Sequence, residues 1–298
     1  MFVIKYKAVF FTISLLAVAA AVWALFTYGL NFGTDFKGGT IMELQYSADR
    51  PSADAIREKL EPFDLRSVVI QPAGDQGMLL RFSTITEPEH EAILGVLTAG
   101  TASTTETRYS SIGPSLGAEL ARKGMIALGL AIGVIIIYIA VAFRAVSRPV
   151  SSWKYGVIAI VALLHDVIIP TGVFAILGHF YGVEIDSLFL TALLTIFGLS
   201  VSDTIVVFDR IRENLKKHRT EPFTETVGKS LEETFVRSFN TSLTVILALV
   251  ALLLFGGQTT RYFALALTIG MLVGTYSSIF IASPLLVVWG KRSIQNRK

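Results

Sequence analysis

The chain has 298 residues, of which 52% are hydrophobic and only 16% are charged, and its mean hydropathy is +0.61. Soluble domains carry about 25% charged residues, so this composition indicates a membrane protein. The absence of cysteine excludes disulfides, thiolate-bound zinc and a cysteine nucleophile, and at a net charge of +3 no block of Lys and Arg is dense enough to predict nucleic-acid binding.

Six apolar runs are long enough to cross a bilayer, which takes about 20 helical residues. They are predicted at residues 8–30, 124–143, 155–177, 187–208, 239–255 and 262–289. The first run follows Lys5 and Lys7, but its apolar stretch continues through Trp23 and Phe26, past the small residues at which a signal peptide would be cleaved. We therefore expect an uncleaved signal anchor. The last run is long for one span, so we expect it to tilt or to continue into the interface.

The basic residues of the short connections indicate the orientation. One side of the predicted membrane holds Lys5, Lys7, Arg144, Arg148, Lys154, Arg210, Arg212, Lys216, Lys217, Arg219, Lys291, Arg292, Arg297 and Lys298. The opposite connections, 178–186 and 256–261, hold only Arg261 and His179. By the positive-inside rule both termini are cytoplasmic. The predicted domains are therefore the N-terminal tail and first span at 1–30, an external domain at 31–121, and five spans at 122–298 with a cytoplasmic loop at 209–237.

The external domain has the pattern of an α+β fold. Strands are predicted at 40–47, 66–74, 76–84 and 105–113, and helices at 52–63, where Ser52 is the N-cap, and at 87–100. The order β-α-β-β-α-β is that of the ferredoxin-like split βαβ arrangement. An α+β sandwich of another connectivity remains possible. The predicted fold is thus a membrane bundle of six transmembrane helices with one external, ferredoxin-like domain.

Four residues flank this domain at turns. Gly38 and Gly39 precede the first strand, and a glycine pair there predicts a tight turn with a close backbone approach. No Walker lysine follows, so no phosphate site is predicted. Gly113 and Pro114 follow the last strand, where Pro114 is well placed to begin a helix and to act as a rigid hinge. His90 lies on a polar helix face, so we expect a solvated side chain and no metal site.

The loop at 209–237 is predicted to contain a helix extension, a turn and an amphipathic helix. Phe223, Val227, Leu231 and Phe235 share one face of that helix. Two interpretations stay open. The helix could lie on lipid head groups or a partner, or the apolar stripe could pack under the bundle.

Asp203 lies within the apolar run of the fourth span, about six residues, or 9 Å, inside its cytoplasmic boundary. An ionised carboxylate near a membrane centre costs about 2.5–3.5 kcal/mol, so such a residue is a candidate functional site. In a low-dielectric site it can alternate between its neutral and charged forms near neutral pH, as a proton carrier must. Ser200 and Thr204 flank it on nearby faces. The alternative is a structural Asp that caps a helix or pairs permanently with a cation.

Arg237 opens the predicted fifth span, which runs antiparallel to the fourth. The arginine could reach Asp203 from the cytoplasmic end and bias its charge state, although an arginine cannot itself relay a proton. Its alternative role is a side chain that extends to the interface. The polar residues that follow predict a hydrated inner wall: Asn240, Thr241, Ser242 and Thr244.

His165 and Asp166 form a titratable pair near the middle of the third span, four residues before Pro170. Such a pair predicts a second element of a proton path. Neighbouring helical residues point about 100° apart, so Asp166 is the preferred pathway residue and His165 the weaker one. A hydrogen-bonded structural pair that joins helices is the equal alternative.

Five segments of the chain resemble the SecF family, the smaller membrane subunits of the bacterial SecD–SecF complex. The segments are NFGTDFKGGT (31–40), IGPSLGAEL (112–120), LLHDV (163–167), LSVSDTIVVFDRIREN (199–214) and RSFNTSLT (237–244). The DTIVVFDRIREN run is the most specific of them. Ser202 stands where many members carry Asn, a change that leaves the carboxylate of Asp203 intact.

The resemblance implies a mechanism and partners. SecD and SecF are similar to the resistance–nodulation–division transporters, whose working unit has twelve spans, so an obligate SecD partner is implied. Proton flow into the cytoplasm would then drive movements of the external domain that promote late steps of protein translocation across the inner membrane. Asp203 and Arg237 match family positions of that path, and His165–Asp166 fits the family pattern. The SecYEG channel, the translocating polypeptide and, as further candidates, YajC and YidC are implied partners.

The resemblance implies neither an enzyme nor a cofactor. Two rival functions remain: half of an exporter of the related transporter superfamily, and a non-conducting scaffold that stabilises the translocation channel. The external domain is small for a substrate-binding exporter. Replacement of Asp203 by Asn would separate a scaffold from a proton-driven subunit.

Overall fold

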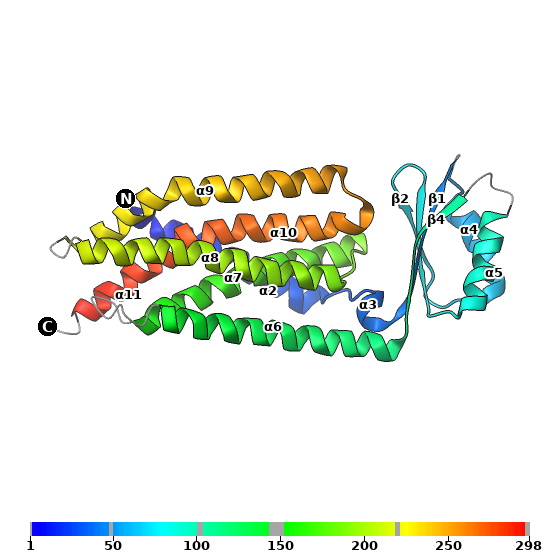
Figure 1. Cartoon of the computed structure of the whole chain (residues 1–298), viewed down its shortest axis with the longest axis horizontal. Coiled ribbons are helices and arrows are strands. Elements are labelled where there is room, and N and C mark those ends of the chain that lie inside the picture. Colours follow the sequence, from blue (N-terminus) through cyan, green and yellow to red (C-terminus); the bar gives the residue numbers. More distant parts are fainter. Residues whose placement is uncertain (1, 48–49, 100–103, 143–151, 218–220, 296–298) are drawn as a thin grey trace. The chain divides into compact units, whose positions relative to one another are not determined.

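The computed structural model describes residues 2–47, 50–99, 104–142, 152–217 and 221–295. They form two compact units, whose elements are labelled in Figure 1. The helical unit comprises Met1–Asn31, Ala127–Val183 and Leu188–Lys298, and the sheet unit comprises Phe32–Ile126 with Glu184–Ser187. The sequence predicts a connection between two spans at 178–186 and the start of the fourth span at Ser187, whereas the structure groups Glu184–Ser187 with the sheet unit.

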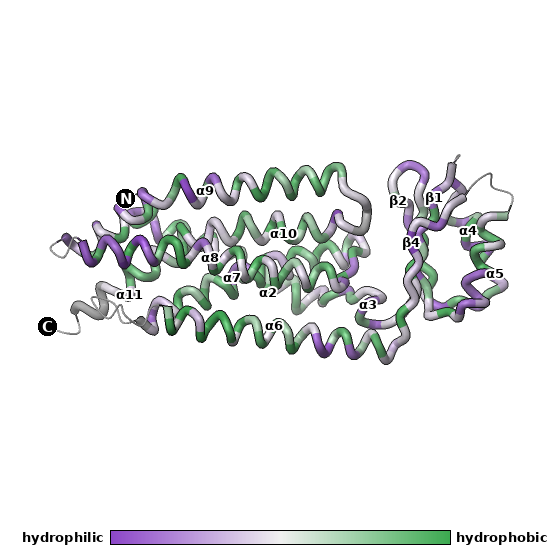
Figure 2. Tube along the Cα trace, in the orientation of Figure 1, coloured by the Kyte–Doolittle hydropathy of each residue, from purple (hydrophilic) through white to green (hydrophobic). Residues whose placement is uncertain are grey.

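Helices make up the helical unit. They are α1 (Phe2–Lys5), α2 (Lys7–Tyr28), α7 (Ser152–Tyr181), α8 (Ser187–Lys217), α9 (Phe223–Phe255), α10 (Gln258–Ser277), the π-helix η2 (Ser278–Ala282) and α11 (Ser283–Gln295), and α6 (Pro114–Ala142) enters it from the sheet unit. In the described part of the chain, six helical stretches are long and apolar enough to cross a membrane, and Figure 2 shows their hydrophobic character. The number of predicted spans is confirmed.

Two helices differ from the predicted spans. The fifth span is predicted to begin at residue 239, but α9 is one continuous helix from Phe223. No proline interrupts the residues between, so the backbone stays helical where the hydropathy changes. The last span is interrupted by the π-helix η2, and α11 continues it. The predicted turn at 218–220 and the residues Phe143, Arg144, Arg148, Arg219, Arg297 and Lys298 lie outside the described residues.

The structure decides between the two interpretations of the apolar stripe on α9. Phe223, Val227 and Leu231 are buried in the hydrophobic core of the helical unit, and Phe235 is 41% exposed. The core also contains Phe208 and Ile211 of α8. The first three residues of the stripe therefore pack under the bundle, and Phe235 does not.

The sheet unit contains the predicted strands and helices in the predicted order. They are β1 (Gly39–Tyr46), α4 (Ala53–Leu60), β2 (Val69–Ala73), β3 (Gly77–Phe82), α5 (Glu87–Thr98) and β4 (Thr104–Ile112). Two short helices were not predicted separately: α3 (Thr34–Lys37) and the 3-10 helix η1 (Glu61–Phe63). The strands form one antiparallel sheet in the order β2-β3-β1-β4. Ser52 caps α4, because its Oγ accepts a hydrogen bond from the backbone N–H of Ala55 at 3.2 Å.

One face of this sheet carries the core of the unit. Met42 and Leu44 of β1 and Leu80 of β3 are fully buried together with Ile56 of α4 and Ile93 of α5. Figure 1 shows both helices on the same face of the sheet. The alternation of buried and less buried residues along β1 and β3 is the period-two pattern that the sequence carries.

The prediction for His90 is wrong, because its side chain is buried and bonded. Its Nε2 lies 3.0 Å from Oε1 of Glu106 on β4, and its Nδ1 lies 3.4 Å from Oε1 of Glu87. The ring stacks on that of Tyr109 at a centroid distance of 3.7 Å. Burial lowers the pKa of His90, but hydrogen bonds and charge interactions with Glu106 and Glu87 together raise it above the ordinary histidine value. The partners on β4 are not visible in the local helical pattern.

Candidate functional site

Asp166 is the centre of a buried polar cluster that joins three helices of the helical unit. Its side chain on α7 is fully buried. Its Oδ2 accepts hydrogen bonds from Ser277 Oγ of α10 at 2.7 Å and from Ser200 Oγ of α8. Its Oδ1 lies 2.9 Å from Nδ1 of His165. A buried carboxylate requires this many partners, since each unsatisfied polar group in a membrane core costs several kcal/mol.

Small residues let α8 and α10 approach closely enough for these bonds. A Cβ on Gly274 would lie 3.3 Å from Cβ of Ser200 and 3.6 Å from Oδ2 of Asp166. One turn earlier, a Cβ on Gly270 would overlap the side chain of Ile196. Glycines spaced by four residues are typical of closely packed membrane helices.

His165 has one partner and one free nitrogen. Its Nδ1 faces Asp166, while its Nε2 is buried and has no hydrogen-bond partner among the described residues. Its ring stacks against Tyr276 at a centroid distance of 6.3 Å, and Tyr276 donates a hydrogen bond to the carbonyl oxygen of Phe10 at 3.0 Å. The histidine and the aspartate thus face each other, although neighbouring helical residues start out about 100° apart.

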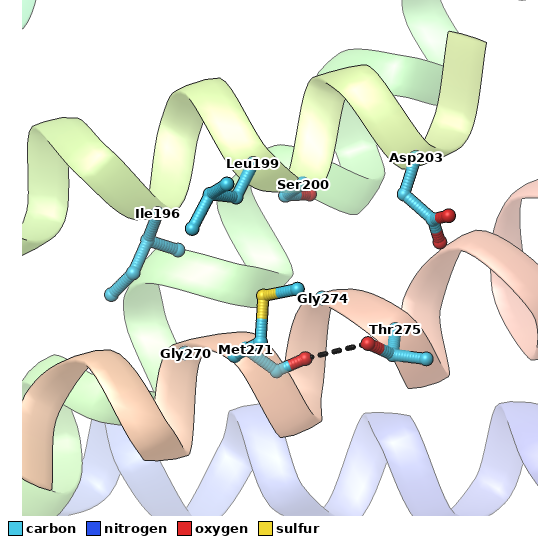
Figure 3. A pocket seen from close by; sticks show the side chains of 8 residues that line it. All are labelled: Ile196, Leu199, Ser200, Asp203, Gly270, Met271, Gly274 and Thr275. Carbon is cyan, nitrogen blue, oxygen red and sulfur yellow. Dashed lines mark hydrogen bonds between the residues drawn. The ribbon is translucent and has the colours of Figure 1, made fainter. Parts of the chain in front are cut away.

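Asp203 lies one turn beyond Ser200 on α8, in a different environment. Its carboxylate borders a small cavity of about 10 Å³ between α8 and α10. Figure 3 shows the Asp203 side chain pointing from α8 toward α10. The hydroxyls of Ser238 and Ser278 lie close to the carboxylate. Within the described residues, Oδ2 of Asp203 and Oγ of Ser238 are nevertheless buried without a hydrogen-bond partner.

The structure does not bring Arg237 to Asp203. The Arg237 side chain is exposed, and no ion pair found among the described residues contains it. Its neighbour Ser238 faces Asp203 instead. Consecutive residues on a helix point about 100° apart, and here Ser238 is buried on the inner face of α9 while Arg237 is exposed.

The other predicted pathway residues likewise divide into buried residues that face the bundle and exposed residues that face outward. Ser242 is buried and accepts a hydrogen bond from Thr275 Oγ1 at 2.6 Å, and Thr204 is buried and shares a hydrogen bond with Ser278 at 2.9 Å. Asn240, Thr241 and Thr244 are exposed on α9. Ser238 and Ser242 are four residues apart and lie on the inner face, which leaves the other three on the outer face.

The end of α10 and the start of η2 contribute hydroxyl groups that the sequence patterns did not single out. Thr275, Ser277 and Ser278 supply hydroxyls to Ser242, Asp166 and Thr204. The signal in the sequence is the polar run TYSS at 275–278 inside an apolar span. Ser278 is also the first residue of the π-helix η2. Single π-turns occur frequently at functional sites.

The predicted turn residues lie together in the sheet unit. Gly38 and Gly39 have φ angles of 80° and 142°, which L-residues rarely adopt. A Cβ on Gly38 would lie 2.7 Å from Cα of Pro114, the first residue of α6. A Cβ on Gly117 would in turn lie 2.8 Å from the backbone nitrogen of Gly38. Gly113, in contrast, has open space around its Cα.

Comparison with known proteins gives matches along most of the chain. Residues 94–292 match the family described as "Protein export membrane protein SecD/SecF, C-terminal", and residues 23–49 match the "SecD/SecF GG Motif". The "Protein translocase subunit SecF" of Thermobaculum terrenum is 43% identical, with 96% of this chain and 93% of that protein covered. That of Synechocystis sp. is 41% identical, with 95% and 90% covered.

A solved structure gives the same result. The crystal structure of SecDF, a translocon-associated membrane protein from Thermus thermophilus, is similar with a TM-score of 0.82 and 36% identity. The match covers 97% of this chain but only 38% of the SecDF chain. By its matched family models and its relatives, the chain belongs to the SecD/SecF family of protein-export membrane proteins, as one of the SecF protein translocase subunits.

Proposed function

We propose that this chain, as an accessory subunit of the Sec protein translocase, works with SecD and uses the proton-motive force to promote late steps of protein translocation across the cytoplasmic membrane. The observation that carries the proposal is the pair of carboxylates in the membrane-spanning helices, Asp166 and Asp203, connected through Ser200 and the α8 backbone. Ionisable residues inside a membrane mark ion or proton pathways.

The two carboxylates suit different parts of that task. Asp166 has a full set of partners, so it holds α7, α8 and α10 together and can pass a proton to His165. Asp203 has an unsatisfied oxygen beside a pocket, so a change in its charge is free to alter its surroundings. When ionised, it requires hydroxyl donors; when protonated, it becomes a donor itself.

Protonation of Asp203 would therefore change which hydroxyls bond to it. Ser238 on α9 and Ser278 at the start of the π-helix are the candidates. A switch of this kind requires an element with two packed arrangements. We assign this role to the π-helix η2, because moving its extra residue by one turn would rotate the residues between its old and new positions about the helix axis. In this mechanism Arg237 swings toward Asp203 when that residue is ionised and biases its charge state.

SecD is the partner that this function requires. The relative from Thermus thermophilus is a SecDF chain, of which the present chain spans 37%. The outer face of α9 presents Arg237, Asn240, Thr241 and Thr244. Polar side chains on a membrane helix are costly against lipid, so a polar face of a partner helix would cover them. SecYEG, the translocating polypeptide and, as candidates, YajC and YidC complete the proposed partners.

The proposed location and domain division follow the charge pattern. Both termini are cytoplasmic and the protein resides in the inner membrane, as the basic residues of its connections favour. The tail and first span are 1–30, the external domain is 31–121 and the remaining spans are 122–298. We assign the ferredoxin-like arrangement to the external domain, supported by the strand order β2-β3-β1-β4 with a helix after β1 and another after β3. The proposed role is transport without an enzymatic reaction.

Replacement of Asp203 by Asn tests the proposal, because the amide keeps the shape of the side chain but cannot ionise. We expect export driven by a proton gradient to fall at least tenfold in membrane vesicles that contain the SecD partner, since proton transfer stops at this residue. Asp209→Asn is the matched control on the same helix, because Asp209 is exposed and pairs only with Arg212 in the described ion pairs. Normal export by Asp203→Asn would instead support a non-conducting scaffold, and export of small molecules in place of proteins would support the exporter.

A further inference from the structure

The sheet unit holds the external end of α8. The connection between α7 and α8 contributes Glu184–Ser187 to the sheet unit. The backbone N–H of Gly33 donates a hydrogen bond to the carbonyl oxygen of Ile185 at 2.9 Å, and Phe32 and Ile185 form a parallel β-bridge. Ser187 is also the first residue of α8, whose later residues belong to the helical unit. Like α6, α8 therefore has residues in both units.

Asp35 supplies the cap for that helix. Its Oδ2 accepts hydrogen bonds from the backbone N–H of Ser187 at 2.9 Å and from Ser187 Oγ. The first N–H groups of a helix have no partner within the helix, and a carboxylate there also complements the helix dipole. Most caps come from the residue just before the helix. This one comes from 152 residues earlier in the chain, in the FGTDFKGG segment.

A second pair of side chains holds the same connection. Nε of Arg81 on β3 lies 3.3 Å from Oε2 of Glu184, and both side chains are about one-fifth exposed. Arg81 also donates from its guanidinium to Oε1 of Gln71 on β2 at 3.0 Å. A Cβ on Gly33 would lie 3.0 Å from the same Glu184 oxygen, so the backbone of this segment fits closely around the pair.

We propose that Asp35 is a positioning residue that ties the external end of α8 to the sheet unit, with Arg81–Glu184 as its support. This inference rests on the proposed function. Ser200 and Asp203 lie on α8, and Asp203 is 16 residues from Ser187, or about 24 Å along the helix. A helix that moves when Asp203 changes its charge would carry Ser187 with it, and the cap would pass that movement to the sheet unit.

Two substitutions of Asp35 separate the tie from a general loss of stability. Asp35→Ala removes the acceptor, so the stimulation of export by a proton gradient should fall roughly five- to tenfold, the effect of losing one helix cap. Asp35→Asn keeps an acceptor oxygen and should lose less than about twofold. Asp75→Ala is the control, because Asp75 is exposed in the turn between β2 and β3 of the same unit. Normal stimulation of export in Asp35→Ala would overturn the proposal.

A reversible covalent tie gives the second test, for which the cysteine-free chain is well suited. In the double variant Asp35→Cys with Ser187→Cys, a disulfide would replace the hydrogen bonds. Oxidised vesicles should keep the stimulation by the proton gradient, and reductant should lower it to the level of Asp35→Ala. A disulfide that blocks export would overturn the proposal, because the contact would then have to open. Failure to cross-link would also overturn it, since the two residues would not be neighbours.

Asp203→Asn, measured in parallel, distinguishes failure of the tie from failure of the proposed function. If Asp203→Asn loses the stimulation and Asp35→Ala keeps it, only the tie is wrong. If Asp203→Asn keeps the stimulation, the proton-driven function is wrong, whatever Asp35→Ala does. The unfolding temperature of each variant verifies that it is folded.

Discussion

The two membrane carboxylates lie on neighbouring helices, Asp166 on α7 and Asp203 on α8, but they differ in their hydrogen bonds. Asp166 has three side-chain partners, whereas Asp203 has a buried oxygen without one. The sequence marks both as candidate functional residues, because charges in apolar runs are rare and costly. Their partners could not: Ser277 is 111 residues from Asp166, and serines in membrane helices commonly bond to their own backbone.

Removal of the Asp166 carboxylate should destabilise the helical unit. In Asp166→Ala, the hydroxyls of Ser200 and Ser277 lose their acceptor, and we expect a loss of roughly 2–3 kcal/mol in the free energy of unfolding. Asp166→Asn keeps one acceptor and should lose less. Thermal unfolding in detergent measures both, with exposed Asp209→Asn as control. An unchanged unfolding temperature of Asp166→Ala would show that the cluster does not hold the helices together.

His90 should make the external domain less stable as the pH rises. Its pKa is raised in the folded state, so the protonated histidine stabilises the domain through Glu106 and Glu87. This contribution is fully present below about pH 6.5, the unfolded value, and is lost as the pH rises through the higher folded pKa.

Hydrogen exchange of β1–β4 in the intact protein at pH 6 and pH 8.5 measures this effect. Protection should be higher at the lower pH in the wild type, and the difference should shrink in His90→Gln. Tyr109 stacks on the ring and titrates only at much higher pH, so it does not obscure the comparison. The same pH dependence in both proteins would contradict the prediction.

Helix packing at the element scale depends on where glycines lie. A Cβ on Gly172 of α7 would overlap the backbone and Cβ of Ala21 on α2, and α2 packs along α7. Hydropathy predicted that both segments cross the membrane, but it could not predict which faces meet. It also could not predict that α9 starts at Phe223, because hydropathy marks the membrane and not the end of a helix.

Gly172→Ala should therefore destabilise the protein even though alanine favours a helix. The added methyl forces α2 and α7 apart, at a cost of about 1–3 kcal/mol. Gly129→Ala on α6 is the matched control, because a Cβ there meets nothing within 4 Å. It should be neutral or stabilising by up to about 1 kcal/mol. Thermal unfolding in detergent compares the two, and an equal effect would mean that α2 and α7 are not in close contact.

The whole molecule should have its sheet unit outside the cytoplasm. Single cysteines can be introduced without background, because the chain has none. Asp75→Cys in the sheet unit should react with a membrane-impermeant maleimide in intact spheroplasts. Lys217 is the last residue of α8 and its side chain is 58% exposed, so Lys217→Cys should react only after permeabilisation. Labelling of both sites in intact cells would contradict the orientation that the basic residues predict.

The sequence alone determined the properties that depend on short runs of neighbouring residues. These are the number of spans, the order of strands and helices in the sheet unit, and the family segments from 31–40 to 237–244. Only the tertiary structure decided that Ser238 and not Arg237 faces Asp203, that His90 is buried, and that Asp35 caps α8. The physical reason is that each of these contacts depends on the rotation and approach of distant elements, which hydropathy and periodicity do not encode.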